Sequence, residues 1–131
     1  MNKANPQPKV LIIDDEIDLC KLFKKILRHE GYTVYAAQSG TGGIKINEKS
    51  NPELIILDLK MPEMSGIETL RRIRKKDKDV IVIILTGYGD AETIRNAADL
   101  NVYDYMSKPF NIEMILKIIR EALAPMEKKG E

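Results

Sequence analysis

Short apolar runs alternate with amphipathic segments along this chain, and most of the runs end in or beside polar residues. Buried parallel strands have near-continuous apolar sequences, and in open α/β sheets the ligand site lies outside the carboxyl ends of the strands. The pattern therefore predicts a sheet that gathers carboxylates, a hydroxyl and a lysine at one edge. The runs and the polar residues after them are 10–13 with Asp14 and Asp15, 54–57 with Asp58, 80–85 with Thr86, and 102–106 with Ser107 and Lys108.

The spacing of apolar residues and the turn signals between them set the expected elements. The strict alternation of strands and helices predicts an α/β fold, a doubly wound parallel sheet with helices on both faces. The expected strands are 10–13, 33–37, 54–57, 80–85 and 102–106, and the expected helices are 17–30, 41–49, 67–76, 90–100 and 112–124. The boundary signals are a stop at Gly31, a capping box of Ser65 and Glu68, N-caps at Asp90 and Asn111, a left-handed cap at Asn101 and a stop at Pro125.

Composition sets limits on the class of protein. A chain of 131 residues forms one domain, and its net charge of +1 creates no field for nucleic acid. The basic cluster at 71–76 is interpreted as the solvated face of a helix, and the single cysteine, Cys20, as a surface or rim residue. No apolar run is long enough to span a membrane, and residues 1–8 lack an apolar signal core. We therefore expect a cytoplasmic protein with no membrane contact and no direct nucleic-acid contact.

The polar residues at the predicted sheet edge suit one kind of chemistry. The carboxylates of Asp14, Asp15 and Asp58 would repel one another unless a cation lies among them, and Mg²⁺ prefers such oxygen ligands. The ammonium of Lys108 and the hydroxyl of Thr86 suit a phosphoryl group carried on one carboxylate. The competing interpretation is that the acidic residues are helix caps and turn residues, which we prefer for Glu16 and Asp18. Binding of a small ligand also stays open at this point.

Four segments together resemble the receiver domain of two-component response regulators. They are 13–16, 58–62 with Gly66, 85–89 and 103–110, and the resemblance covers about residues 8–124. Each segment alone is a weak signal, but their order and their positions at strand ends make the set specific. The resemblance implies a flavodoxin-like five-stranded sheet in the order 2-1-3-4-5. It also places the receiver domain at 8–124. From the sequence itself, we expect a disordered tail at 1–7 and a second tail at 125–131.

The resemblance assigns a role to each residue of the predicted site. Asp58 would be the phosphoacceptor, taking its phosphoryl group from a histidine kinase or a histidine phosphotransfer protein. Asp15 and Asp58 would bind Mg²⁺ with the backbone carbonyl of Lys60, and Asp14 would act through water. Lys108 would contact the phosphoryl oxygens. In this interpretation the chain is no enzyme for a separate substrate, because it catalyses its own phosphorylation and dephosphorylation.

The same resemblance predicts how the signal leaves the site. Thr86 would move toward the phosphoryl group and Tyr105 would turn inward behind it, although spacing alone makes Tyr105 an ordinary strand residue. The output surface would be the helix at 90–100, the strand at 102–106 and the helix at 112–124, which would contact a downstream protein. The Lys108–Pro109 bond would be cis. The resemblance leaves dimerisation on phosphorylation open.

Three departures of this chain from the family pattern bear on these expectations. Lys60 and Tyr88 flank the approach of a hydrolytic water in the family, and neither is suited to orient that water, so we expect a long-lived phosphoryl group.

Gly42 and Gly43 each cost a helix about 1 kcal/mol relative to alanine. The family usually has alanine at the position of Gly43, so we expect the helix at 41–49 to be short or mobile. Asn101 replaces a frequent glycine and tolerates the left-handed conformation.

Several functions fit this sequence. The chain is interpreted first as a complete single-domain regulator or phosphorelay intermediate, and alternatively as the receiver of a larger DNA-binding transcription factor. A magnesium-dependent aspartyl-phosphate hydrolase of the haloacid dehalogenase type needs a second aspartate two residues after the nucleophile, where this chain has Lys60. A ligand-binding module that is not phosphorylated is disfavoured by the full set of Asp14, Asp15, Asp58, Thr86 and Lys108.

Overall fold

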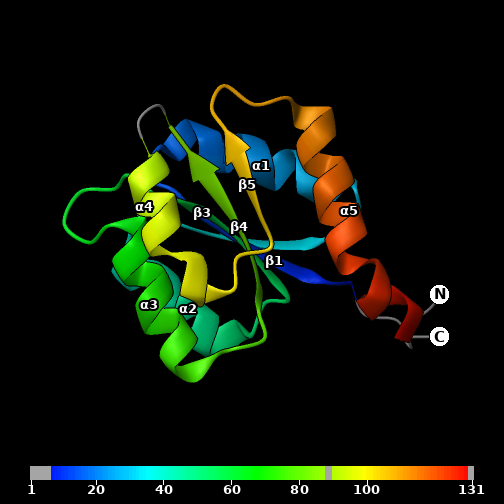
Figure 1. Cartoon of the computed structure of the whole chain (residues 1–131). Helices are drawn as coiled ribbons and strands as arrows, with labels where there is room; N and C mark the ends of the chain where they lie inside the picture. The colour runs from blue at the N-terminus through cyan, green and yellow to red at the C-terminus, as the bar shows by residue number, and fades with distance from the viewer. Residues whose placement is uncertain (1–6, 88–89, 130–131) are drawn as a thin grey trace.

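A five-stranded parallel sheet runs through the centre of the molecule (Figure 1). The computed structural model describes residues 7–87 and 90–129. The strands lie in the order β2-β1-β3-β4-β5, and every neighbouring pair is parallel, as predicted. Their bounds are Lys9–Ile13 for β1, Thr33–Ala37 for β2, Leu54–Asp58 for β3, Ile81–Thr86 for β4 and Asp104–Ser107 for β5.

Helices cover both faces of this sheet, which confirms the doubly wound α/β fold (Figure 1). One core cluster packs α1 and α5 against the sheet, and a second packs α2, α3 and α4 against the opposite face. The helices are α1 Ile17–His29, α2 Gly40–Ser50, α3 Gly66–Lys76, α4 Ala91–Asn96 with the short 3₁₀ turn η1 Ala98–Leu100, and α5 Ile112–Lys129.

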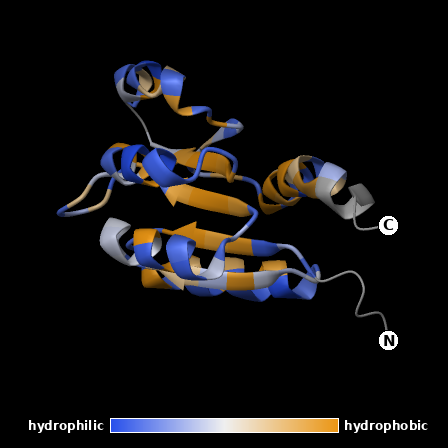
Figure 2. Ribbon diagram, turned by 90° about the horizontal axis from the view of Figure 1, so that it is seen from below, coloured by the Kyte–Doolittle hydropathy of each residue, from blue (hydrophilic) through white to orange (hydrophobic). Residues whose placement is uncertain are grey.

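The central strands are apolar because they are buried on both faces. In β1, Val10 and Ile12 belong to the cluster with α1 and α5, whereas Leu11 and Ile13 belong to the cluster on the other face. Successive side chains of a strand point to opposite faces, so a strand covered on both sides must be apolar throughout. Figure 2 shows these apolar strands in orange, between helices that carry both hydrophilic and hydrophobic residues.

Most of the predicted turn signals are confirmed. Gly31 has a φ of +100° directly after α1, a conformation that glycine adopts at little cost. Asn101 has a φ of 56° and ends η1 as a left-handed cap. The Ser65 side chain accepts the Glu68 N–H, and the Asn111 side chain accepts the Met114 N–H. These bonds satisfy amide groups that have no partner within their own helix.

Two helix ends differ from the prediction. Helix α5 continues through Pro125 to Lys129, so residues 125–129 are helical. A proline inside a helix forfeits its own hydrogen bond, and here alanine, leucine and charged residues on both sides favour the helix. Helix α4 ends at Asn96, and the chain tightens into η1 before Asn101. Side chains three residues apart lie on the same side of a 3₁₀ turn, which allows Ala97 and Leu100 both to be buried.

Helix α2 is not shortened by its glycines, contrary to the expectation. It spans 11 residues, and its N-cap, Ser39, accepts the N–H of Gly42. A Cβ atom at position 43 would clash with the side chain of Ile13 in β1. Gly43 therefore allows α2 to pack close to the sheet, which offsets its low helix propensity.

Two surface assignments were wrong. Cys20 is buried in the core, and its thiol donates a hydrogen bond to the Asp14 carbonyl at 3.3 Å. Arg74 is also buried, although it belongs to the basic cluster expected in solvent. Its guanidinium donates to the carbonyls of Leu100 and Asn101, each at 2.8 Å, because η1 packs beside this face of α3.

Among the described residues, no helix is both long enough and apolar enough to cross a membrane.

Candidate functional site

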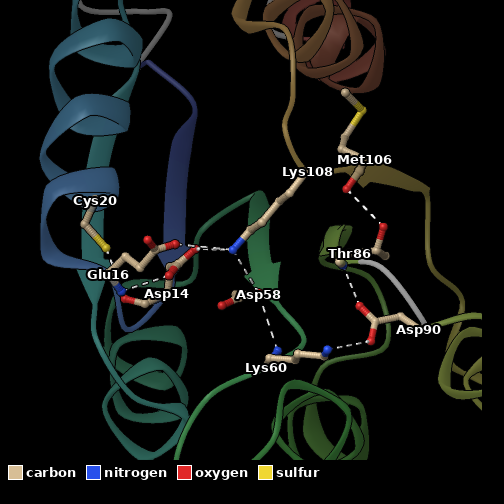
Figure 3. A network of polar contacts seen from close by, with 10 residues as sticks. Asp14, Glu16, Cys20, Asp58, Lys60, Thr86, Asp90, Met106 and Lys108 are labelled. Atoms are coloured by element: carbon tan, nitrogen blue, oxygen red, sulfur yellow. Dashed lines mark hydrogen bonds and ion pairs between the residues drawn. The ribbon is translucent and has the colours of Figure 1, made fainter.

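An open cavity lies at the carboxyl ends of the strands, at the predicted edge of the sheet. Its lining residues are Asp15, Glu16, Asp58, Lys60, Gly87 and Lys108. They lie at or after the ends of β1, β3, β4 and β5, which reach the same edge of the sheet because the strands are parallel. Figure 3 shows Lys108 reaching across this cavity toward the acidic side chains.

Asp14 lies directly after β1 and is completely buried. One of its carboxylate oxygens accepts the Glu16 N–H at 2.9 Å. The other, Oδ2, has no hydrogen-bond partner among the described residues, and lies 3.7 Å from the Lys108 ammonium. Burial raises the pKa of Asp14 to about 6, and the nearby Asp58 carboxylate also raises it. A buried carboxylate oxygen that lacks a hydrogen-bond partner could take a cation as its partner.

Asp58 is the last residue of β3 and is only 5% exposed. Its Oδ1 atom lies 3.4 Å from the Lys108 ammonium and accepts a long bond, also 3.4 Å, from the Lys60 N–H. Burial raises the pKa of this carboxyl, although the positive charge of Lys108 opposes the shift. The carboxylate therefore lines the cavity, and its contacts with Lys108 and Lys60 are long and weak.

Lys108 is the central cation of the cavity. Its ammonium lies 3.4 Å from Asp58, 3.4 Å from Glu16 and 3.7 Å from Asp14. Burial lowers its pKa, but the attraction of Asp14 and Asp58 outweighs this and leaves the pKa raised. The backbone N–H of Lys108 donates to the Thr86 carbonyl at 2.8 Å, which ties the end of β5 to β4. The Lys108–Pro109 bond is cis, as the resemblance implied.

The acidic residues of the site form one cluster. Asp14, Asp15 and Asp58 each offer a carboxylate oxygen, and these oxygens lie within 4.8 Å of one another. Asp15 is exposed, whereas the other two aspartates are buried. An oxygen-only donor set with a buried, unpartnered oxygen on Asp14 fits a small hard divalent cation. The cluster can therefore bind a metal ion.

The two predicted switch residues lie on the neighbouring strands β4 and β5. Thr86 is buried at the end of β4, and its hydroxyl donates to the Met106 carbonyl at 3.3 Å (Figure 3). Tyr105 is half-buried in β5 and packs against the core cluster of α2, α3 and α4. Burial raises the pKa of its phenol. The Thr86 hydroxyl is thus bonded to β5 rather than to the acidic cluster.

Sequence reasoning missed two acidic residues of this region. Glu16 was interpreted as a helix cap, but its side chain caps nothing and pairs with Lys108. Asp90 was predicted to cap α4, but its carboxylate accepts the Gly87 N–H and pairs with Lys60 at 3.8 Å. The spacing of three residues is the only sequence signal for the bond between Gly87 and Asp90. Tyr88, a predicted neighbour of the phosphoryl group, lies outside the described residues.

Comparison with known proteins identifies the family. Residues 10–120 match the family model of the response regulator receiver domain. The chain belongs to this receiver domain family. Its sheet order and its acidic cluster at the carboxyl edge agree with that membership. The receiver is similar to a CheY-like receiver domain protein from Methanospirillum hungatei JF-1, with a TM-score of 0.88 and 31% identity; 94% of this chain and 98% of that chain are covered.

Curated relatives of this receiver differ in length. Sporulation initiation phosphotransferase F of Bacillus subtilis (strain 168) is 35% identical over 115 residues, covering 88% of this chain and 93% of that protein. The uncharacterized transcriptional regulatory protein YkoG of the same strain is 36% identical over 122 residues, covering 93% of this chain but 54% of that protein. The receiver thus spans nearly all of one relative and about half of the other.

The buried charge of Asp14 should reduce the stability of the metal-free receiver. Folding raises the pKa of this carboxyl to about 6. Its ionisation therefore destabilises the fold as the pH rises from the ordinary pKa of an aspartate to the raised pKa in the folded state. We expect Asp14→Asn, which retains an acceptor for the Glu16 N–H, to raise the free energy of unfolding by about 1–3 kcal/mol at pH 7. The gain should disappear below about pH 4, where both states are protonated.

Urea unfolding in the presence of EDTA at several pH values measures this effect. Asp99→Asn is the matched control, because it removes an aspartate charge from an exposed position in η1. An equal gain in both variants, or a gain for Asp14→Asn that does not change with pH, would contradict the explanation.

Proposed function

We propose that this receiver accepts a phosphoryl group on Asp58 from a histidine kinase or a histidine phosphotransfer protein, in a reaction that requires Mg²⁺. The main support is the position of Asp58. Its carboxylate is buried at the end of β3, shares an acidic cluster with Asp14 and Asp15, and lies 3.4 Å from the Lys108 ammonium. A nucleophilic oxygen beside a fixed cation and a cation-binding cluster suits phosphoryl transfer.

Each residue of the cavity has a role in this proposal. An oxygen of Asp58 attacks the phosphorus atom of the donor, and the bond from phosphorus to the donor's histidine nitrogen breaks. Lys108 neutralises the charge that gathers on the phosphoryl oxygens. Asp15, Asp58 and the Lys60 carbonyl would hold Mg²⁺, with Asp14 acting through water, and the bound ion would supply further neutralisation of that charge. Asp14 and Glu16 orient Lys108 through the contacts described above.

Acetyl phosphate tests the proposal without a partner protein. Incubation of the chain with acetyl phosphate and Mg²⁺ should add one phosphate to the intact mass, and EDTA should prevent the addition. No mass increase would contradict the proposed function. Continuous turnover of phosphate esters, without a persistent phosphorylated protein, would instead support the hydrolase alternative.

Two cellular contexts fit the relatives. The nearly complete coverage of a phosphotransferase supports a phosphorelay intermediate or single-domain regulator that acts on another protein. The partial coverage of a transcriptional regulator supports the receiver of a larger DNA-binding protein. The length of the native open reading frame distinguishes these contexts. In either context, we propose that the receiver contacts a downstream protein through α4, β5 and α5.

Phosphorylation should change the contacts behind the cavity. Moving toward a phosphoryl group on Asp58, the Thr86 hydroxyl would leave the Met106 carbonyl, and Tyr105 could fill the space behind it. We expect beryllofluoride to shift amide resonances throughout residues 90–124, and Thr86→Ala to lose these distant shifts while still binding beryllofluoride. The measurement is amide NMR with and without beryllofluoride. Shifts restricted to the residues that line the cavity would contradict the switch.

A long phosphoryl lifetime remains a prediction. In the structure the Lys60 ammonium lies beside Asp90 rather than over Asp58, and its side chain is 70% exposed. Neither lysine nor tyrosine orients a hydrolytic water as a carboxylate or amide does, which still favours slow hydrolysis. The control that Lys60 exerts on the lifetime therefore depends on whether its ammonium leaves Asp90.

A further inference from the structure

Asp90 makes contacts that its place before α4 does not explain. Its side chain forms no capping bond with α4. One carboxylate oxygen accepts the backbone N–H of Gly87 at 2.5 Å, and the other lies 3.8 Å from the Lys60 ammonium. The residue is only 6% exposed. Figure 3 shows Asp90 on the opposite side of Asp58 from Glu16 and Asp14. This buried charge is therefore directed at the edge of the cavity.

Lys60 connects Asp90 to the reactive carboxylate. Its backbone N–H donates to Asp58 Oδ1, while its side chain extends to Asp90. Lys60, Gly87 and Asp58 line the same cavity. A lysine side chain is a flexible four-carbon stem that carries a compact charge, so rotation alone could bring its ammonium to an oxygen on Asp58. The high exposure of the Lys60 side chain leaves this rotation unhindered.

The strengths of the two partners favour an exchange on phosphorylation. The Lys60–Asp90 pair is longer than a hydrogen bond and its cation lies in solvent, so it belongs to the class of weak ion pairs. A phosphoryl group on Asp58 would carry a charge of about −1.5 to −2 and three strong acceptor oxygens. It would attract the ammonium more strongly than a single carboxylate does. Asp90 would keep its bond to Gly87 and lose its pair with Lys60.

We propose that Asp90 is a positioning residue that holds the Lys60 ammonium away from Asp58 until a phosphoryl group draws it across the cavity. The inference rests on the proposed phosphorylation of Asp58 and adds a control on how tightly the phosphoryl group is held. It also links the charge on Asp58 to the segment that begins α4, because Asp90 directly precedes Ala91 in that helix.

Asp90→Asn tests the inference, because the amide oxygen can still accept the Gly87 N–H while the charge that attracts Lys60 is gone. We expect this variant to bind beryllofluoride about threefold more tightly and to lose its phosphate about threefold more slowly, the range of a weak ion pair. In a Lys60→Gln background, Asp90→Asn should change neither quantity. Lys60→Gln alone should weaken beryllofluoride binding.

Two further variants separate charge from structure. Glu92→Gln removes the same charge from an exposed residue in the first turn of α4 and should leave both quantities unchanged. Asp90→Ala also removes the acceptor for Gly87, so a difference between it and Asp90→Asn measures that bond. Beryllofluoride affinity is measured by titration, and phosphate loss by intact mass in Mg²⁺ after removal of acetyl phosphate.

The outcomes distinguish this inference from the proposed function. Wild-type protein that gains one phosphate on Asp58, with unchanged beryllofluoride affinity in Asp90→Asn, would overturn only the role of Asp90. A gain of about threefold in beryllofluoride affinity in Glu92→Gln would also overturn it. So would such a gain on adding Asp90→Asn to the Lys60→Gln background. Wild-type protein that gains no phosphate would overturn both. If Asp90→Asn does not fold, undiminished beryllofluoride binding by Lys60→Gln would overturn the inference, since Lys60 is exposed and its loss leaves the core intact.

Discussion

Asp58→Asn should abolish phosphorylation of the chain by acetyl phosphate. The amide has nearly the shape of the carboxylate but lacks the charged oxygen that attacks phosphorus. No neighbouring acid replaces it. Asp14 is completely buried beneath the cavity, and Asp15 and Glu16 are exposed at its rim, whereas the Asp58 carboxylate is buried against both Lys108 and the Lys60 N–H. Intact mass should therefore show one phosphate on the wild type and none on the variant.

Glu16→Gln is the matched control for this experiment. Glu16 lies 3.4 Å from the same lysine ammonium as Asp58, so its substitution also removes one acidic partner of Lys108. We expect Glu16→Gln still to gain one phosphate, because Asp14 and Asp58 remain beside the Lys108 ammonium in this variant. Circular dichroism should show that both variants are folded. A full mass increase in Asp58→Asn would show that another residue accepts the phosphoryl group.

The sheet edge could be predicted because it depends on features that are local in sequence. Apolar runs identify buried strands, and parallel strands end on the same side, so Asp58 at the end of β3 was expected at the same sheet edge as the residues after β1, β4 and β5. The roles proposed for Asp58, Lys60 and Thr86 rest on resemblance to a family, since spacing alone also allowed caps and small-ligand sites. The strand order came from the resemblance as well.

The errors occurred where the environment of a side chain depends on a distant segment. Arg74 belongs to a run of basic residues, and only the packing of η1 against α3 shows that its guanidinium is buried on carbonyl groups. Gly43 weakens an isolated helix, but a Cβ atom at this position would clash with the side chain of Ile13 unless that side chain moved. Asp90 has the sequence of a helix cap, and its pairing with Lys60 depends on the loop after β3. Sequence propensity predicts which segments form helices, but the environment of each side chain depends on tertiary contacts.

Asp15→Ala should remove Mg²⁺ binding and phosphorylation together while the fold persists. Asp15 is the exposed member of the acidic cluster, so its side chain contributes little to the core, and the truncation leaves no buried cavity. Mg²⁺ is held by few protein carboxylates, and losing even an outer partner of a metal site costs about 10–100-fold in affinity. We therefore expect a loss of at least about tenfold in Mg²⁺ affinity. Titration with Mg²⁺ and intact mass after acetyl phosphate measure the two effects.

Asp18→Ala is the control that separates a ligand from a nearby charge. Asp18 is an exposed aspartate in the first turn of α1, three residues after Asp15, and does not belong to the acidic cluster. Its substitution removes the same charge from the same end of the molecule, so any general electrostatic attraction of Mg²⁺ should weaken equally in both variants. A ligand role requires that Asp15→Ala lose affinity and phosphate while Asp18→Ala retains both. If Asp15→Ala binds Mg²⁺ as tightly as the wild type does, Asp14 and Asp58 hold the ion without Asp15.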